Sequence, residues 1–209
     1  MIHIIDYEAG NATSVKRAFD HIGVDSAITK DSDVVRNADR LVFPGVGRAR
    51  AAMGVLKESG LDRALTDAYW HRTPILGICI GCQIIMTESE EDNTYCLDLI
   101  HGNCRRFVPV YDNTKVPHMG WNQITVTQPH PVLEGITEGD EVYFVHSFYP
   151  ELTEKSNVYA SCEYEVTFPA AIGHRNLFAV QFHMEKSGPV GLQMLNNFAH
   201  WNGETNDEK

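Results

Sequence analysis

Apolar segments alternate with segments of helical pattern through the first half of the chain. The apolar segments predict buried strands at 1–7, 24–29, 40–43 and in the run that reaches Cys79. The segments between them predict helices at 12–22, 31–35, 48–59 and 61–71. Strands that alternate with helices favour a parallel sheet with helices on both faces. Functional sites are then expected at the carboxyl ends of the strands.

The second half of the chain has shorter apolar segments and more turn signals. Strands are predicted at 104–110, 121–126, 141–148, 158–164, 169–174 and 177–182. Gly-His-Arg-Asn at 173–176 predicts a hairpin turn, and 189–201 predicts a closing helix. The polar end of the chain, about 203–209, is expected to fray. The pattern as a whole predicts one α/β domain over 1–209, with a central mixed, mostly parallel sheet flanked by helices.

The composition narrows the class of protein. The 209 residues are 43% hydrophobic and 22% charged, which suits one large domain with an ordinary core. The five cysteines have no framework spacing, so we expect reduced thiols and a cytoplasmic protein. No apolar run approaches the ~20 residues of a membrane span. The net charge of −11 argues against nonspecific nucleic-acid binding but is compatible with a protein partner.

The stretch 73–85 carries the clearest chemical signal. An apolar run passes Gly77, reaches Cys79, passes Gly81 and continues as helix formers. Gly-x-Cys-x-Gly is the spacing of a nucleophile elbow, in which a strained turn between strand and helix presents the nucleophile. The glycines allow the backbone to crowd there. Free N–H groups at a helix start favour the thiolate, which is the nucleophilic form of cysteine.

Three other interpretations of Cys79 remain open on this motif alone. Cys79 could be a buried structural cysteine near a turn. Cys79 and Cys82 form a C-x-x-C, which could be a redox pair. A zinc site is disfavoured because the remaining cysteines lack ligand spacing, so no metal is expected. These remaining cysteines are Cys96, Cys104 and Cys162.

A catalytic cysteine needs a base and a group that orients the base. His183 follows the last predicted strand, and Glu185 lies two residues further on. In an extended segment these two side chains point the same way, so the carboxylate could hold the imidazole in one tautomer. The alternative is a surface His-x-Glu pair, and the chain has ten histidines.

These residues together resemble the class I, or triad, glutamine amidotransferases. The resemblance rests on Leu-Gly-Ile-Cys-Ile-Gly-Cys-Gln at 76–83 and Gln-Phe-His-Met-Glu at 181–185. Further motifs are similar to those of the glutaminase subunits of imidazole glycerol phosphate synthase, in histidine biosynthesis. These motifs are Pro-Gly-Val-Gly at 44–47, Val-Pro-His-Met-Gly-Trp-Asn at 116–122, Tyr-Phe-Val-His-Ser at 143–147 and Glu-Lys-Ser-Gly at 185–188.

The resemblance implies a glutamine-hydrolysing enzyme without a cofactor. Cys79 would attack the side-chain amide of glutamine, His183 would transfer the proton to the leaving ammonia, and Glu185 would orient His183. A glutamyl thioester would form, and water would hydrolyse it to glutamate. The oxyanion would be stabilised by backbone N–H groups, which the resemblance places at Val46, Gly47 and Ile80.

The resemblance also implies how glutamine is bound. The substrate-binding residues would be Gln83, Glu91, His146, Ser147 and Phe148. Two of these have simpler alternatives. Gln83 could be a polar helix residue, and Glu91 belongs to an acidic run that could be a solvated surface.

A protein partner is a further implication of the resemblance. The family's glutaminase docks on a (β/α)8-barrel cyclase, which receives the ammonia and makes imidazole glycerol phosphate and an aminoimidazole carboxamide ribotide. The motif positions near that interface are Asn11, Met119, Trp121, Asn122 and Lys186. Exposed Trp and Met suit the core of an interface. Without the resemblance, Trp121 would be interpreted as a core aromatic.

The chain departs from the family pattern at several positions. Met184 stands where proline is usual, so the turn to Glu185 is less constrained. Cys82 replaces a common methionine, Phe148 a frequent tyrosine, and 96–102 a loop richer in Gly and Pro. These departures leave open a paralogue that supplies ammonia to amidinate a surface sugar. A thiol redox protein and a catalytically silent regulatory subunit are the alternatives from other classes.

Overall fold

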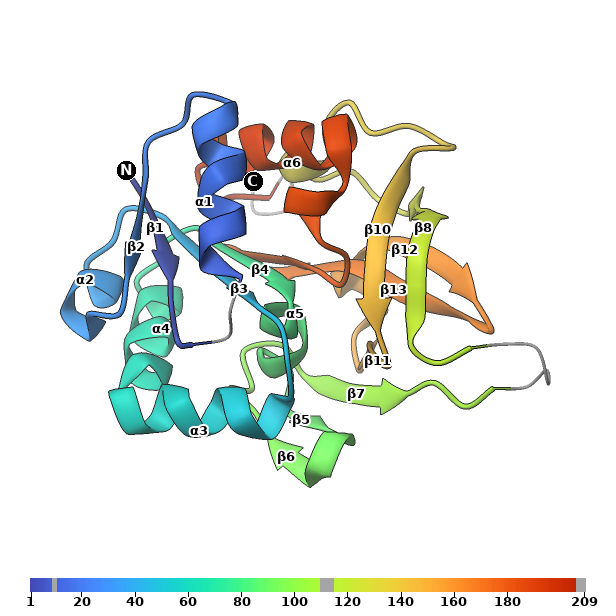
Figure 1. Cartoon of the computed structure of the whole chain (residues 1–209), viewed down its shortest axis with the longest axis horizontal. Helices are drawn as coiled ribbons and strands as arrows, with labels where there is room; N and C mark the ends of the chain where they lie inside the picture. The colour runs from blue at the N-terminus through green and yellow to red at the C-terminus, as the bar shows by residue number, and fades with distance from the viewer. Residues whose placement is uncertain (9–10, 110–114, 206–209) are drawn as a thin grey trace.

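The computed structural model describes residues 1–8, 11–109 and 115–205 and centres on an eight-stranded sheet (Figure 1). The strand order is β2-β1-β3-β4-β14-β13-β12-β9. Neighbours from β2 to β14 are parallel, and those from β14 to β9 are antiparallel. The bounds are β1 (Ile2–Ile5), β2 (Ser26–Thr29), β3 (Leu41–Gly45), β4 (Ile75–Cys79), β9 (Thr125–Val126), β12 (Val158–Tyr164), β13 (Val166–His174) and β14 (Leu177–Val180). The predicted mixed, mostly parallel sheet is confirmed.

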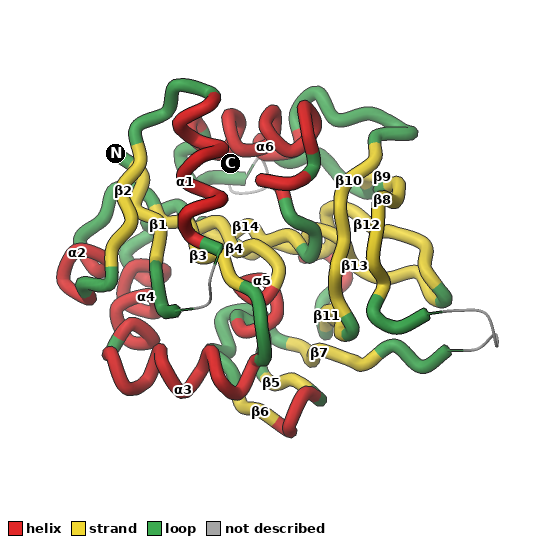
Figure 2. The backbone as a smooth tube through the Cα atoms, in the orientation of Figure 1, coloured by secondary structure: helices red, strands yellow, loops and turns green. Residues whose placement is uncertain are grey.

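Helices cover both faces of this sheet (Figure 2). One face carries α1 (Ala12–His21) and α6 (Gly188–His200), which contact each other. The other carries α2 (Ser32–Arg36), α3 (Ala49–Ser59), α4 (Leu61–Trp70) and α5 (Ile80–Ile84). The predicted helices are confirmed to within about one residue at each end. The Asp31 side chain caps α2 by accepting hydrogen bonds from the N–H groups of Asp33 and Val34.

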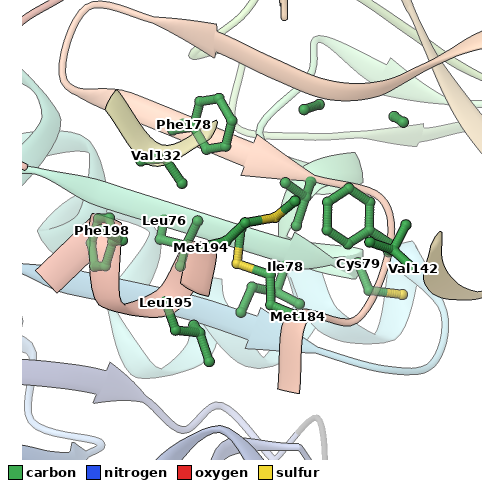
Figure 3. Close-up of a cluster of buried hydrophobic side chains, with 14 of the residues drawn as sticks. Leu76, Ile78, Cys79, Val132, Val142, Phe178, Met184, Met194, Leu195 and Phe198 are labelled. Carbon is green, nitrogen blue, oxygen red and sulfur yellow. The ribbon is translucent and has the colours of Figure 1, made fainter. Parts of the chain in front are cut away.

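Two hydrophobic cores follow from the alternation of side chains along the strands. Ile4 packs into the core under α1 and α6, and the next residue, Ile5, packs into the core under α2 to α5. In the first core, Leu76 and Phe178 meet Leu195 and other residues of α6 (Figure 3). Cys79 lies at the rim of this cluster, so the end of β4 is held by packing on a rigid core.

Two smaller sheets stand beside the main one. An antiparallel pair joins β8 (His118–Gln123) to β10 (Glu141–His146). The second has the order β11-β7-β5-β6. Its strands are β5 (Glu88–Ser89), β6 (Thr94–Tyr95), β7 (Gly102–Arg106) and β11 (Phe148–Leu152). The predicted single strand 141–148 is wrong because the chain passes from β10 to β11 at Ser147, and these strands belong to different sheets.

The predicted single strand 121–126 is likewise wrong, because its residues are divided between β8, in the two-stranded sheet, and β9, in the main sheet. The predicted strand 104–110 is shorter, since β7 ends at Arg106, and residue 110 lies outside the described part.

Other differences concern short elements and the chain end. Within the described ranges, four 3-10 helices have no predicted counterpart, and they are η1 (Glu91–Asn93), η2 (Pro131–Leu133), η3 (Lys155–Asn157) and η4 (Met184–Lys186). In the expected tail, Gly203 is buried and Trp201 Nε1 donates to the Glu204 carbonyl at 2.7 Å, so this part is held to the body. Residues 206–209 lie outside the described part. None of the helices described has the length and apolar character needed to cross a membrane.

Candidate active site

Cys79 occupies a strained turn between β4 and α5. Its backbone has φ 56° and ψ −106°, a conformation that L-residues rarely adopt. A Cβ at Gly77 would lie 2.9 Å from that of Ala179, and one at Gly81 would lie 1.9 Å from the Phe43 carbonyl oxygen. The two glycines are therefore required by the close approach of β14 to β4 at Gly77 and of β3 to the start of α5 at Gly81. This geometry is that of the nucleophile elbow predicted from the motif.

His183 and Glu185 form a buried pair just beyond β14. His183 Nδ1 lies 2.7 Å from Glu185 Oε1, and neither side chain is exposed to solvent. Because Nδ1 faces a carboxylate, it carries the proton in this hydrogen bond. Among the described residues, His183 Nε2 has no hydrogen-bond partner. The second nitrogen is therefore available to a reacting thiol.

The surroundings of His183 and Glu185 favour the charged form of both side chains. Burial acts to lower the pKa of His183, but its interactions with Cys79 and Glu185 outweigh burial and raise the pKa to about 10. Burial acts to raise the pKa of Glu185, but His183 and Asn11 hold it below its usual value. At neutral pH the pair is therefore an imidazolium and a carboxylate, and the imidazolium is the form that can give a proton to a leaving group.

The turn that carries His183 and Glu185 is fixed without proline at position 184. Met184 is fully buried in the core of Figure 3. The His183 N–H donates to the Tyr143 carbonyl at 2.9 Å, and the Ser187 hydroxyl donates to the His183 carbonyl at 2.6 Å. Core packing and these hydrogen bonds therefore fix the turn without the restricted φ that a proline would supply.

Asn11 belongs to the same hydrogen-bond network. Its side chain is buried, and Nδ2 donates to Glu185 Oε1 at 2.8 Å. The sequence indicated Asn11 only as an interface position. The contact was missed because no spacing rule connects residue 11 with residue 185, and only the fold brings the start of α1 to the end of β14.

A pocket of about 350 Å³ opens beside Cys79. All the residues expected from the resemblance to bind glutamine or the oxyanion line it. They are Val46, Gly47, Ile80, Gln83, Glu91, His146, Ser147 and Phe148. A larger hollow, about 660 Å³, lies over β11 to β13 and contains neither Cys79 nor its candidate partners. The smaller pocket is therefore the candidate active site, because its wall contains the candidate nucleophile Cys79.

The proposed oxyanion turn lies directly against the elbow. Gly45, the last residue of β3, is in parallel register with Cys79. Beyond it, Val46 is 39% exposed and Gly47 has φ 108°, a conformation that favours glycine. The strand pairing therefore delivers the 45–47 turn to the same edge as the Ile80 N–H.

Gln83 and Glu91 are already held by the protein. Gln83 Nε2 donates to the Phe148 carbonyl at 3.1 Å and lies 3.0 Å from Gln181 Oε1. Glu91 Oε2 accepts the N–H of Ala49 at 2.7 Å and so caps the start of α3. Their side chains are thus oriented at the pocket before a substrate arrives.

A chain of neutral histidines supports the far wall of the pocket. His146 Nδ1 donates to the Phe148 carbonyl at 2.8 Å, so its Nε2 must accept from His118 Nδ1 at 3.0 Å. Asn122 Nδ2 then donates to His118 Nε2 at 3.3 Å. Burial lowers the pKa of His146 to about 3 and that of His118 to about 4. The hydrogen bonds therefore run in one direction, from β8 to the wall of the pocket.

The residues expected at a partner interface are divided between surface and interior. Met119 and Trp121 project from β8 and are 62% and 53% exposed. Lys186 is also exposed. Trp121 lies near Gly188, which follows Lys186 by two residues, so the two exposed side chains belong to one region of the surface. Asn122 is half-buried and donates to the Glu163 carbonyl at 3.0 Å. The exposed aromatic and methionine are features of a docking surface, whereas Asn11 is buried.

Cys82 does not have the properties of a redox partner for Cys79. Its side chain is fully buried in α5. Burial, and then the charge of Cys79, raise its pKa well above the ordinary value, so it stays a thiol. Each of the five cysteines is free. The C-x-x-C is therefore best explained by helix packing.

The sequence is similar to those of known proteins over nearly its whole length. The model of the glutamine amidotransferase class-I family matches residues 3–201. Imidazole glycerol phosphate synthase subunit HisH of Nitratidesulfovibrio vulgaris (strain DP4) is 46% identical, with 99% of each chain covered. The protein of the same name from Geobacillus kaustophilus is 44% identical, with 95% of each chain covered.

Solved structures agree on the fold. A glutamine amidotransferase matches with a TM-score of 0.73 at 14% identity, covering 94% of this chain and 96% of that one. Another, from Thermotoga maritima, matches with a TM-score of 0.63 at 14% identity, covering 88% and 75%. The chain therefore belongs to the class I glutamine amidotransferases and, among them, to the family of the HisH subunits of imidazole glycerol phosphate synthase.

Proposed function

We propose that this chain is the glutaminase subunit of an imidazole glycerol phosphate synthase. It hydrolyses glutamine to glutamate and ammonia and passes the ammonia to a cyclase subunit. The observation that carries this proposal is the buried His183–Glu185 pair, which accompanies a cysteine at a strained elbow beside a pocket. The full-length similarity to HisH subunits supports the choice of pathway.

Hydrolysis proceeds in two half-reactions. The Cys79 thiolate attacks the side-chain amide carbon of glutamine, the C–N bond breaks, and imidazolium His183 gives its proton to the departing ammonia. Water then attacks the thioester and transfers a proton to His183, and glutamate leaves as the sulfur is released. Backbone N–H groups of Ile80 and of the 45–47 turn stabilise the oxyanion in both halves. Glu185 keeps His183 in the required tautomer throughout.

Glutamine is recognised by the groups that line the pocket. Gln83 and Glu91 offer an amide and a carboxylate to the polar end of the substrate. The backbone at 146–148, whose position is fixed by the histidine chain, completes the wall. Each of these side chains is held by a hydrogen bond, so little conformational entropy is lost when glutamine binds.

The partner in this proposal is a (β/α)8-barrel cyclase that docks on the β8 surface around Met119, Trp121 and Lys186. The cyclase would use the ammonia to make imidazole glycerol phosphate and aminoimidazole carboxamide ribotide. Direct transfer is advantageous because ammonia in neutral water is mostly protonated and then is not nucleophilic. A complex of this kind would act in the cytoplasm, in keeping with the five free cysteines.

The test measures glutamate release by the chain alone and with its organism's cyclase plus the phosphoribulosyl formimino intermediate. We expect strong activation by the loaded cyclase and a loss of about 10³-fold or more in Cys79→Ala. Hydrolysis that ignores this cyclase would favour a paralogue with another acceptor. Activity that is absent under all conditions, or retained in Cys79→Ala, would contradict the proposal.

A further inference from the structure

Tyr7 carries a buried hydroxyl group that the mechanism above does not use. The side chain is 2% exposed, and within the described part of the chain its Oη has no hydrogen-bond partner. Burial, and then the charge of Cys79, raise the pKa of Tyr7 well above its ordinary value, so the group remains a neutral donor. Buried polar groups are nearly always paired, so an unpaired one calls for a physical explanation.

The hydroxyl lies directly behind the proposed oxyanion turn. A Cβ added to Gly45 would lie 1.9 Å from Tyr7 Oη and 2.3 Å from Ile80 Cγ2, so the three residues meet at one point. The Tyr7 ring packs on Phe43 at 5.1 Å between centroids. Tyr7 is not part of the pocket wall, which is formed by Val46, Ile80 and their neighbours. Its hydroxyl therefore approaches Gly45 from outside the pocket wall.

Packing alone does not account for this hydroxyl. A phenylalanine would fill the same space against Phe43 without placing an unpaired polar group in the core. The backbone of Gly45 lies against the Tyr7 hydroxyl, so the carbonyls of the 45–47 turn are its candidate acceptors if the turn rotates. Gly47, at φ 108°, gives the turn the freedom for such a rotation.

A hydrogen bond to the turn would have a directional consequence. In a trans peptide the C=O and the following N–H point in opposite directions. A carbonyl of Gly45 or Val46 that accepts from Tyr7 therefore directs the next N–H away from Tyr7. Because Val46 and Gly47 line the pocket and Tyr7 does not, we expect that N–H to turn toward the pocket, where the acyl oxygen would lie.

We propose that Tyr7 is a positioning residue for glutamine hydrolysis, whose hydroxyl donates to a carbonyl of the 45–47 turn in the substrate-loaded complex and so aims the turn's N–H at the oxyanion. This inference rests on the proposed glutaminase function. In the chain without substrate the Tyr7 hydroxyl is unpaired, and it donates a hydrogen bond only when substrate is bound. The gain is expected in the transition state, because the oxyanion forms only there.

The test is Tyr7→Phe, assayed with L-glutamine in the complex with the cyclase and its intermediate. We expect kcat to fall about 3- to 10-fold, which corresponds to roughly 0.7–1.4 kcal/mol, with KM within about twofold of the wild type. The melting temperature should be unchanged or higher, because the substitution removes an unpaired buried hydroxyl. A lower kcat with equal or greater stability is a combination that a merely structural role would not produce.

Tyr69→Phe is the matched control. Tyr69 is equally buried, in α4, but its hydroxyl lies 2.6 Å from His174 Nδ1 and away from the pocket. Removing this paired hydroxyl should lower the melting temperature and leave kcat unchanged. The two tyrosines should thus respond in opposite ways.

Three outcomes would overturn the role of Tyr7. They are an unchanged kcat in Tyr7→Phe, a raised KM at unchanged kcat, and a lower kcat that accompanies an equal loss of folded protein. In each case the variant is compared with a wild-type complex that hydrolyses glutamine. A wild-type complex without glutaminase activity would instead overturn the proposed function, and this inference with it.

Discussion

Four of the ten histidines of this protein are buried, and their surroundings are of two contrasting kinds. His183 is fully buried, and its pKa is raised to about 10. His118, His130 and His146 are only 3–4% exposed, and burial lowers their pKa values to about 4, 3 and 3. The difference lies in the partners. His183 interacts with Cys79 and with the Glu185 carboxylate, whereas the other three face carbonyl, amide, imidazole or aromatic groups.

This contrast shows that burial alone does not fix the charge of a histidine. Cys79 and the Glu185 carboxylate together keep one buried imidazole as a cation that can donate a proton. Neutral partners keep the others as directional hydrogen-bonding groups. His118 and His146 support the wall of the pocket, whereas His130 caps η2.

The strongest test of the contrast is Glu185→Gln, which gives His183 a neutral partner. We expect kcat to fall by about 10³- to 10⁴-fold, as when a triad carboxylate is replaced by its amide. The carboxylate stabilises the imidazolium, so its loss should lower the pKa of His183. The alkaline limb of the kcat–pH profile should then move toward neutral pH, as measured by glutamate release from pH 6 to 10.

The control for this variant is Glu151→Gln. Glu151 is an exposed carboxylate that pairs with Arg105 on the surface, and its loss should leave both kcat and the pH profile unchanged. An alkaline limb that stays in place in Glu185→Gln would mean that His183 owes its charge to another group.

The neutral histidines predict an acid-labile fold. Their pKa values are lower in the folded chain than in the unfolded one, so the unfolded chain binds protons first as the pH falls below about 6.5. Stability is therefore lost from that pH down toward the folded pKa values. Each such histidine should remove roughly 2 kcal/mol between pH 7 and pH 5, at about 1.4 kcal/mol per pKa unit.

His130→Asn isolates one of these contributions. His130 Nδ1 accepts the Val132 N–H at 3.1 Å, and its ring stacks on Phe178 at 4.2 Å. Asparagine can keep the accepting role but does not titrate in this range. Loss of the stacked ring should lower stability at pH 7, yet the variant should lose roughly 2 kcal/mol less than the wild type by pH 5. Urea unfolding at several pH values measures this slope, and equal slopes would contradict the prediction.

Most of the fold could be predicted from the sequence because periodicity reports burial. The strands and helices of the first half were found in this way, and so was α6. Elements of two or three residues, such as β5 and η1, carry no period and were missed. The divisions of 141–148 and of 121–126 between two sheets were missed because the pattern of a strand does not show which sheet it joins.

The candidate site divides in the same way. Cys79, His183 and Glu185 lie in short motifs with a local physical logic, so the sequence alone indicated them. The pocket residues were indicated only by resemblance, and the structure places them in one wall. Tyr7, Asn11 and His118 act through contacts with residues distant in sequence, which only the fold reveals.

Asn11→Ala is the mildest test, because it removes a neutral partner from the charged pair. Asn11 Nδ2 donates to the same Glu185 oxygen that binds His183, and this bond helps to keep the carboxylate ionised. We expect kcat to fall about 3- to 10-fold, the effect of one lost hydrogen bond of about 1 kcal/mol. Glutamate release is measured at saturating cyclase, so that a weaker interface does not lower kcat.

A matched asparagine separates orientation from simple structural support. Asn197 in α6 donates to the carbonyls of Val132 and Glu134, far from the pair, so Asn197→Ala should lower the melting temperature without changing kcat. If Asn11→Ala keeps the wild-type kcat and only weakens binding of the cyclase, Asn11 is an interface residue alone. If kcat falls at saturation, the carboxylate depends on its neutral partner as well as on its charged one. The charged histidine would then differ from the neutral ones by its carboxylate partner. Both kinds would still depend on an asparagine amide, since Asn11 orients Glu185 and Asn122 orients His118.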